Sequence, residues 1–325
     1  MQAFESFEHY AAALGHADLR VLALGRDRAP WEMLQTEVDG ISVRTARDGG
    51  PCLFEGSIAA DGIALMMGID AAGKICGNGI PFGPRSVLLS PGRTTIQSTS
   101  LDAVFWMSVF IPASRLQTQS PLSEELPTRP GRVIEVPTQE YAELRNLLWR
   151  IIAATKAGAF ASNPAGQHDA AFQLTRIVAS IATGPGVCLK SDRAVGRPRW
   201  SRLQIMDRAR AVVEAHSGTS LHVNELASAV GVSIRTLNNA FQEQMGISPR
   251  CFVRVCTLNA ARSALRLAEQ GDVKVSEIAA RLGIWEWGRF SRDYRMLFGE
   301  LPSETLRGRR GSSSRTLLLK SSDRH

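Results

Sequence analysis

The sequence predicts an α+β protein in which an N-terminal antiparallel β domain with flanking helices is linked to an all-α domain. At 325 residues the chain is long enough for about two domains that each bury a core of their own. From Val21 to Pro112, short strand-forming segments alternate with Gly, Pro, Asp and Asn at a spacing of roughly ten residues. From residue 140 onward the apolar residues repeat at helical spacing instead.

The balance of charge differs between the two parts of the chain. Residues 1–195 hold 17 Lys and Arg against 19 Asp and Glu, whereas residues 196–325 hold 21 against 12. The net charge of +7 therefore comes from the C-terminal part, whose cations are nearly all Arg. Arg suits bidentate contact with phosphate and guanine, so this distribution indicates that only the C-terminal part meets a polyanion.

The composition argues against several classes of protein. The five cysteines are scattered and show no CxxC spacing, which is typical of a reducing cytosol and indicates neither a zinc site nor a disulfide framework. The N-terminus carries Glu5, Glu8 and Asp18, and no apolar run approaches about 18 residues, so we expect neither a signal peptide nor a membrane span. We therefore expect a soluble cytoplasmic protein without metal or cofactor.

The first 112 residues are expected to form a short helix followed by strands. Residues 1–20 place Phe4, Phe7 and Tyr10 on one side of a helix. The most apolar strand, Val104–Ile111, is expected at the centre of its sheet and buried on both faces. The spacing predicts a small antiparallel barrel or sandwich. The expected strands are Glu32–Glu37, Ile41–Ala46, Cys52–Ile58, Ile63–Ile69, Ser86–Leu89, Thr94–Gln97 and Ala103–Ile111.

Two amphipathic helices are expected after a Pro-rich connection. Glu140–Ala157 and Gln167–Ala182 both carry apolar residues at helical spacing, with Phe172 on the apolar face of the second. These helices either cap the core of the β domain or form a dimer interface, because their apolar faces are wide for so small a sheet. Residues 191–201 are expected to be a linker, and residues 309–325 a disordered basic tail.

The all-α domain contains an internal repeat. The first copy reads LASAVGVS over Leu226–Ser233, and the second reads IAARLGIW over Ile278–Trp285. Each continues into a further helix that ends at a glycine, Gly246 in the first copy and Gly299 in the second. A helix, a tight turn at glycine and a second helix make a helix-turn-helix, which places its second helix in the major groove of DNA.

The second helix of the first copy divides into an inner and an outer face. Leu237 and Phe241 face inward, and Ser233 is a good N-cap. Arg pairs well with guanine, and Asn and Gln pair with adenine, so the outward residues are suited to read bases. They are Arg235, Thr236, Asn238, Asn239 and Gln242. Between the copies, Ser248 and Pro249 supply an N-cap and a first-turn proline for a long helix that runs to about Leu267, and we expect this helix to have a structural role.

The second helix of the second copy lies within Gly283–Arg307. Its apolar residues, such as Phe290 and Tyr294, hold the helix, while Arg289, Arg292 and Arg295 lie on the other face. Trp285 and Trp287 either pack on thymine methyl groups or sugars, or one of them braces the turn. Glu286 either accepts a hydrogen bond from cytosine or caps the helix. Two such units in tandem, in the only basic part of the chain, predict DNA binding.

From near Leu203 to Arg309, these residues resemble the double helix-turn-helix domain of the AraC/XylS family of transcriptional regulators. The motifs that carry the resemblance are ELASAVGVSIRTLNNAFQEQMGISP and EIAARLGIWEWGRFSRDYRMLFGELPSETLR. The second is especially similar to the branch that contains regulators of the ethanolamine-utilisation operon. The resemblance implies a DNA-binding domain over residues 202–308, with base contacts from Arg235, Asn238, Asn239, Trp287, Gly288 and Arg292. Gly288 has no side chain, so Arg289 is expected to substitute for it.

The same resemblance implies that residues 1–190 are an effector-sensing and dimerising domain of cupin-like β-barrel form. The implied partners are double-stranded promoter DNA, a small-molecule effector, a second copy of the chain and, for an activator, RNA polymerase. The protein would then lie on the bacterial nucleoid when bound to DNA. Effector-binding residues stay unassigned, although some large side chains are expected to line the barrel: Trp31, Met66, Met67, Cys76, Trp106 and Phe110.

Two other functions remain open on the sequence. The first is an enzyme fused to a DNA-binding module. A DNA-repair enzyme of this kind would need a cysteine cluster for zinc, which the scattered cysteines do not supply. A cupin-type enzyme would need His ligands on the strands, yet residues 17–167 contain no histidine. A purely architectural DNA binder would leave the β domain without a role. A DNA-binding transcriptional regulator that responds to a small molecule accounts for both parts of the chain.

Overall fold

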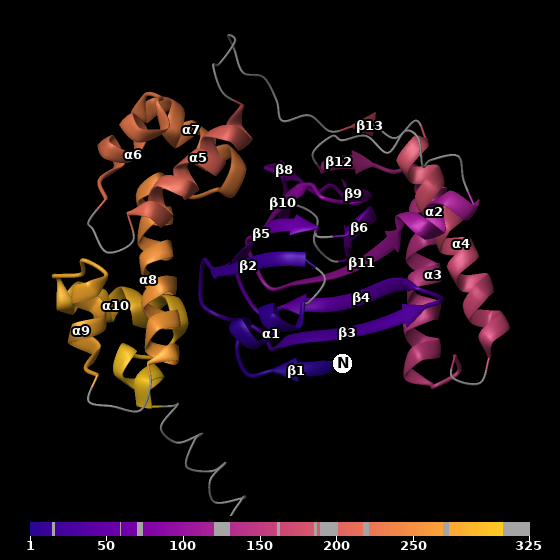
Figure 1. The fold of residues 1–325 in the computed structure, drawn as a ribbon, viewed down its shortest axis with the longest axis horizontal. Helices are drawn as coiled ribbons and strands as arrows, with labels where there is room; N and C mark the ends of the chain where they lie inside the picture. The colour runs from indigo at the N-terminus through magenta and orange to yellow at the C-terminus, as the bar shows by residue number, and fades with distance from the viewer. Residues whose placement is uncertain are drawn as a thin grey trace, which may run out of the picture. The chain divides into compact units, whose positions relative to one another are not determined.

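A computed structural model describes most of the chain. It divides into two compact units, one formed by Met1–Val21 with Arg28–Gly196 and the other by Leu22–Asp27 with Arg197–His325. The first unit is rich in strands and the second is helical (Figure 1). The described residues are 1–14, 17–58, 60–69, 74–119, 131–160, 163–184, 187–188, 201–216, 221–268 and 273–307.

The β-rich unit contains two antiparallel sheets. The larger has eight strands in the order β1-β3-β4-β11-β6-β9-β12-β13, and the smaller has five in the order β2-β5-β10-β7-β8. The described strands therefore pair in two sheets that do not close into one barrel. The larger sheet consists of β1 (Gln2–Phe4), β3 (Trp31–Val38), β4 (Ile41–Asp48), β11 (Val104–Pro112), β6 (Gly62–Gly68), β9 (Ser86–Pro91), β12 (Arg132–Glu135) and β13 (Val187–Cys188). The smaller consists of β2 (Ala17–Ala23), β5 (Cys52–Ile58), β10 (Thr95–Ser100), β7 (Ile75–Gly77) and β8 (Ile80–Pro81).

The predicted helix over residues 1–20 is wrong at both ends. Only α1 (Phe7–Ala13) is helical, with Ser6 as its N-cap, while β1 precedes it and β2 follows it. Phe4 pairs with Trp31 in the larger sheet and meets Tyr10 from the strand, with ring centroids 5.6 Å apart. The helical spacing therefore predicted α1 correctly, but Phe4 is in a strand because it pairs with the distant strand β3.

The seven predicted strands are all present, and the predicted central strand occupies the centre of the larger sheet. β11 hydrogen-bonds to β4 on one side and to β6 on the other. Its burial alternates, because Val109 is buried while Ser108 and Phe110 are half-buried. The apolar composition of the strand predicted burial on both faces, but only one face is fully buried. One face meets helices, and the other faces the smaller sheet across a cavity.

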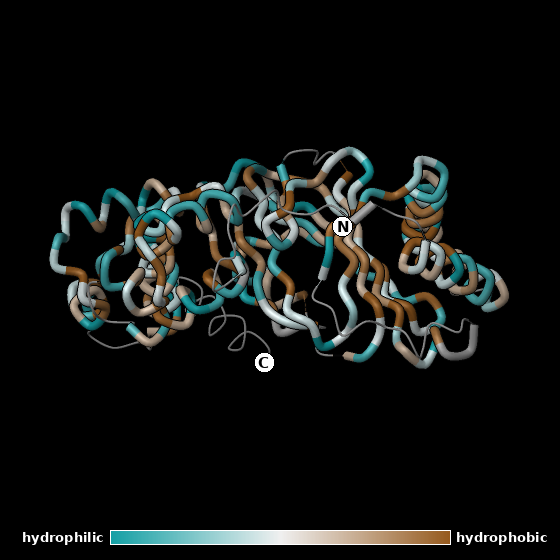
Figure 2. Tube along the Cα trace, turned by 90° about the horizontal axis from the view of Figure 1, so that it is seen from above, coloured by the Kyte–Doolittle hydropathy of each residue, from teal (hydrophilic) through white to brown (hydrophobic). Residues whose placement is uncertain are grey.

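Three helices pack against the larger sheet: α2 (Ala113–Gln119), α3 (Thr138–Lys156) and α4 (Pro164–Thr183). Val109 and Met107 of the sheet share one core with Leu148 of α3 and Val178 of α4, which confirms the two predicted helices as a cover for the sheet. Figure 2 shows hydrophobic stretches along the strands and on the helices beside them. Phe172, expected on the inner face of α4, is instead 48% exposed, because it lies one position beyond the buried stripe.

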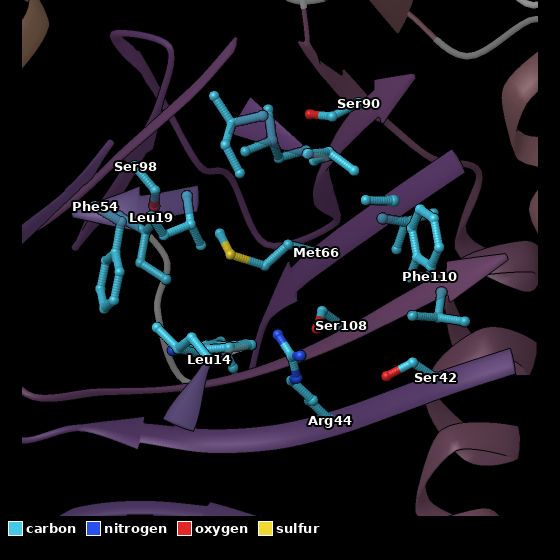
Figure 3. Close-up of a pocket in the computed structure, with 18 of the residues that line it drawn as sticks. Leu14, Leu19, Ser42, Arg44, Phe54, Met66, Ser90, Ser98, Ser108 and Phe110 are labelled. Carbon is cyan, nitrogen blue, oxygen red and sulfur yellow. The ribbon is translucent and has the colours of Figure 1, made fainter. Parts of the chain in front are cut away.

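The cavity between the two sheets has a volume of about 120 Å³ (Figure 3). Alternation along the strands explains its lining, because neighbouring residues of a strand face opposite sides. Val43 and Val109 face the helices, so Arg44 and Ser108 face the cavity. Of the side chains expected to line a barrel, Met66, Trp106 and Phe110 do line this cavity, whereas Trp31, Met67 and Cys76 do not.

The helical unit contains α5 (Arg202–Ala215), α6 (Val223–Val230), α7 (Ile234–Met245), α8 (Pro249–Leu267), α9 (Val275–Arg281) and α10 (Trp287–Phe298). The predicted long helix is α8, and its start is as expected, because Ser248 caps it and Pro249 occupies its first position. α8 contacts α7 in the first repeat and α9 and α10 in the second. The predicted tail, and all of the predicted linker except Ser201, lie outside the described residues.

Candidate nucleic-acid interface

The first helix-turn-helix consists of α6 and α7. α6 ends at Gly231, which has a φ of 77°, and the Val232 N–H donates to the Ala227 carbonyl at 3.0 Å. A residue in the left-handed conformation commonly ends a helix, because the N–H groups that follow can then donate to the last free carbonyls while the chain changes direction. Ser233 then caps α7, its hydroxyl accepting from the Thr236 N–H at 3.1 Å. The sequence signals at this turn are therefore confirmed.

Buried side chains fix the orientation of α7. Leu237 and Phe241 are fully buried, and Phe241 meets Phe252 of α8 edge-on at 5.2 Å between ring centroids. Because the apolar stripe faces inward, the opposite side of α7 is exposed. The predicted base-reading residues Arg235, Asn238, Asn239 and Gln242 all lie on that exposed side.

Two polar side chains of α7 are already hydrogen-bonded within the helix. The Thr236 hydroxyl is half-buried and lies 2.8 Å from the Ser233 hydroxyl, so it belongs to the N-cap. The Asn238 amide donates to the Ile234 carbonyl at 3.0 Å. Thr236 is thus the least exposed of the predicted DNA contacts.

The second helix-turn-helix consists of α9 and α10. Gly283 follows α9 with a φ of 68°, and the Ile284 N–H donates to the Ala279 carbonyl at 2.9 Å, which repeats the geometry of the first turn. Phe290 and Tyr294 are buried against α8 and α9. The Tyr294 hydroxyl lies 2.8 Å from that of Thr305, and burial raises the pKa of Tyr294 to about 12.

The outer side of this unit carries cations and exposed tryptophans. Trp285 is 71% exposed and Trp287 is 40% exposed, so neither is packed into the turn as a core residue. Arg292 and Arg295 are exposed as well, and no ion pair involves either of them within the described part of the chain. Gly288 lies between these side chains with open space where a Cβ would stand.

Arg289 differs from its neighbours because carboxylates hold it. Its guanidinium lies 3.3 Å from Glu286 and 3.8 Å from Asp293, and Asp293 in turn lies 3.6 Å from Arg254 of α8. Glu286 is the N-cap residue of α10, but its side chain makes no capping hydrogen bond. The predicted substitution of Arg289 for Gly288 would therefore require these ion pairs to open.

A hollow of about 720 Å³ lies between the two helix-turn-helix units. The side chains around it include Arg250 and Arg254 of α8, Arg289 of α10 and Trp285. The N-caps of α6 and α8, His222 and Ser248, also border it, and helix N-termini favour anions. Arg250 and Arg254 were missed when α8 was assigned a purely structural role, although two cations in its first two turns were visible in the sequence.

In the described residues, no group of three or more His, Cys, Asp and Glu side chains is placed to hold a metal ion. Nor does any described helix have the length and apolarity needed to cross a bilayer. Four of the cysteines have described side chains and all four are free, Cys256 being buried in α8 and Cys251 half-buried near its start.

Comparisons with known proteins agree on the C-terminal part. Residues 226–308 match a sequence family described as a helix-turn-helix domain, HTH_18. A probable thc operon regulatory protein of Rhodococcus erythropolis is 39% identical over 95 residues, which cover 29% of this chain and 29% of that protein. A XylDLEGF operon transcriptional activator of Pseudomonas putida is 33% identical over 101 residues, which cover 31% and 32% of the two chains. The chain thus matches less than a third of the length of either relative.

Solved structures are also similar over the same part. One of them is described as a probable AraC family transcriptional regulator from Rhodopseudomonas palustris CGA009, and it is 31% identical, with 32% of this chain covering 96% of that one. Its TM-score is 0.30.

Proposed function

We propose that this chain, whose C-terminal domain is a helix-turn-helix domain of the AraC/XylS type, is a sequence-specific DNA-binding transcriptional regulator. The observation that carries the proposal is the pair of helix-turn-helix units built on one long helix. Each unit has a buried apolar stripe and an exposed polar face, and the faces lie on α7 and α10. At about 1.5 Å per residue, α8 spans about 28 Å, close to one turn of DNA at about 34 Å.

Within this function, the exposed faces divide into base readers and phosphate contacts. We assign base reading to Arg235, Asn238 and Asn239 on α7 and to Trp287 and Arg292 on α10, because these side chains are exposed on the two helices that would enter a groove. Further contacts come from Gln242, Trp285, Arg289 and Arg295. Arg250 and Arg254, beside the helix N-termini that border the hollow, would bind phosphate.

The β-rich unit would act as the sensor. We assign residues 1–190 to effector sensing and dimerisation in the manner of a cupin-like domain, and residues 202–308 to DNA binding. An internal cavity supports the sensing role. α3 and α4 support a dimer, because Trp149 and Phe172 stay 41% and 48% exposed on them. The regulator would work in the cytoplasm without turnover of its ligand, and an activator of this kind would also meet RNA polymerase.

The test is binding to DNA from upstream of the gene. Fluorescence anisotropy at moderate salt should show tighter binding to that DNA than to a scrambled duplex, with an affinity that falls as salt rises. Arg235→Ala and Arg292→Ala should each weaken binding to the upstream DNA. Arg145→Ala, which removes an exposed cation from α3, is the matched control and should bind as the wild type does. Equal affinity for both duplexes would refute the proposed function.

A further inference from the structure

The helical unit includes a short segment from the N-terminal part of the chain, Leu22–Asp27. This segment continues from β2, whose first residues belong to the β-rich unit and whose last residue is Ala23. Leu22 and Ala23 are both only 2% exposed. The sequence alone offers no sign of this association, because Ala23 and its partner on α8 are 236 residues apart.

Asn259 of α8 holds the segment through both polar atoms of its side-chain amide. Its Oδ1 accepts from the Ala23 N–H at 3.1 Å, and its Nδ2 donates to the Ala23 carbonyl at 3.1 Å. Nδ2 also donates to the Val255 carbonyl, one turn back along α8, at 2.9 Å. The two bonds to Ala23 form the reciprocal pattern by which residues of neighbouring antiparallel strands pair. The side chain of Asn259 thus takes the place of a neighbouring strand.

The position of Asn259 shows that this pairing is specific. Asn259 is 5% exposed and lies on the same face of α8 as Phe252 and Val255, which are buried apolar side chains. Asn is a weaker helix former than Leu or Ala, and a buried amide is costly when it is unpaired. An apolar residue at position 259 would continue the face but would leave the N–H and the carbonyl of Ala23 without partners. This part of α8 is therefore suited to dock extended backbone.

A second contact of the segment lies at the C-terminal end of α10. A Cβ atom at Gly299, the C-cap of α10, would stand 3.1 Å from Nε of Arg26, so the guanidinium lies beside this helix end. Cations are favourable there, because the last carbonyls of a helix carry partial negative charge. The next residue, Glu300, adds a carboxylate, which pairs with Arg262 of α8 at 2.6 Å. The segment therefore meets both α8 and α10.

The segment docks on the side of α8 that faces away from the proposed phosphate contacts. At about 100° per residue, Asn259 lies about 180° around the helix from Arg250 and about 140° from Arg254. Arg250 and Arg254 border the hollow between the helix-turn-helix units, whereas Asn259 does not. The docked segment thus leaves the proposed DNA-binding side of α8 free, so it does not compete with DNA for that side.

We propose that Leu22–Asp27 is a strap that docks on α8 through Asn259 and holds the helical unit in the arrangement that binds DNA. The inference rests on the proposed function in one respect, since it takes α7 and α10 as the helices that enter DNA. α8 separates these two helices, and the strap braces α8 and α10 from the side that DNA does not occupy. Because the strap is continuous with β2, displacement of this strand undocks the strap and lowers the affinity for DNA.

The test is hydrogen exchange of the Ala23 amide, followed by NMR in the full chain without and with DNA from upstream of the gene. In the wild type this amide should exchange slowly, and saturating DNA should slow it by about fivefold or more, because docking and DNA binding favour each other reciprocally. A contact with a purely structural role would be protected equally with and without DNA. Asn259→Ala removes both bonds to Ala23, so it should speed this exchange by at least about tenfold and weaken binding to the upstream DNA.

Ser263→Ala is the matched control, because it changes an exposed position one turn further along α8, and it should behave as the wild type does. Arg26→Ala provides a second variant in case Asn259→Ala fails to fold, since Arg26 is exposed. It removes the cation at the end of α10 and should speed the exchange of the Ala23 amide by about two- to fivefold.

Four results would each overturn the inference: fast exchange of the Ala23 amide in the wild type, unchanged exchange in Asn259→Ala, no slowing by DNA, or equal affinity of Asn259→Ala and Ser263→Ala for the upstream DNA. Failure of the proposed function looks different. If the wild type prefers the upstream DNA but the exchange of Ala23 does not respond to it, only the inference falls. If the wild type shows no such preference, the proposed function falls, whatever the exchange in the free chain shows.

Discussion

Replacing Asp48 by Asn should remove a loss of stability that the wild-type protein suffers as pH rises. Asp48 is 1% exposed, and burial raises its pKa from 3.8 to about 6, despite the hydrogen bonds it accepts from Trp106, Tyr10 and Ser100. Asn fits the same network, because its carbonyl can accept from Tyr10 and Trp106 while its amide donates to the Ser100 hydroxyl. The substitution therefore removes the titration while keeping the shape and most of the hydrogen bonds.

The direction of the effect follows from proton binding. Between pH 3.8 and about 6 the native state holds the Asp48 proton and the unfolded chain has lost it, so the free energy of unfolding falls as pH rises through this window. A difference of about two pKa units, at about 1.4 kcal/mol each, amounts to about 3 kcal/mol above pH 6. The amide that replaces the carboxyl group in Asp48→Asn does not titrate, so the variant should lack this fall.

The assay is urea unfolding from pH 4 to pH 7, followed by the NMR signals of β4 and β11 amides so that the transition belongs to the β-rich unit. Asp102→Asn is the control. The Asp102 carboxylate accepts a hydrogen bond from the Ala103 N–H at 2.8 Å, which lowers its pKa. The stability that Asp102 contributes to the wild-type protein therefore increases as pH rises. Parallel curves for the wild type and Asp48→Asn across this range would refute the reasoning.

Three further predictions concern the helical unit. Arg292→Ala should cost about 1–3 kcal/mol at one base position of the bound DNA, measured by anisotropy with single-base variants, whereas an equal loss on all sequences would mark a phosphate contact. Gly231→Ala should destabilise the unit by about 1–2 kcal/mol, because its φ is 77°, while Gly288→Ala, with open space at its Cβ in helix α10, should stabilise it by about 0.5–1 kcal/mol. Thermal unfolding that ranks them the other way would contradict this. Trp285→Ala should change stability by less than about 0.5 kcal/mol yet weaken DNA binding; lost stability with intact binding would make Trp285 a brace for the turn.

The two helix-turn-helix units could be predicted from the sequence because their signals are local. Gly231 and Gly283 end one helix each, Ser233 starts the next, and the apolar spacing from Leu237 to Phe241 sets which side is buried. Each of these signals acts within a few residues. The sequence therefore predicted both the helices and their exposed faces, while the contacts of these faces with DNA stay predictions.

The β-rich unit shows where local signals end. Its strands were visible, but their division into two sheets depends on pairings between residues far apart, such as β11 with β4 and β6. The alternation in β4 already placed Ser42 and Arg44 on one face, yet the sequence could not say whether that face meets helices, solvent or a cavity. The sequence therefore offered no reason to single out Arg44, which is buried because it faces the cavity between the sheets.

The free chain holds the side chains proposed to contact DNA in two different ways, which bears on how selectively it binds DNA. Asn238 is hydrogen-bonded to its own helix, and Arg289 is held by Glu286 and Asp293, so both must exchange existing partners for a contact with DNA. Arg292 has no such ion pair in the described part of the chain and gives up less on binding. Because a net hydrogen bond is worth only about 1 kcal/mol, a side chain that must first release a partner is stabilised only where the base fits well. We infer that Arg292 reads its base at little cost to existing contacts, whereas Asn238 and Arg289 engage DNA only where the new contact outweighs the partner they release.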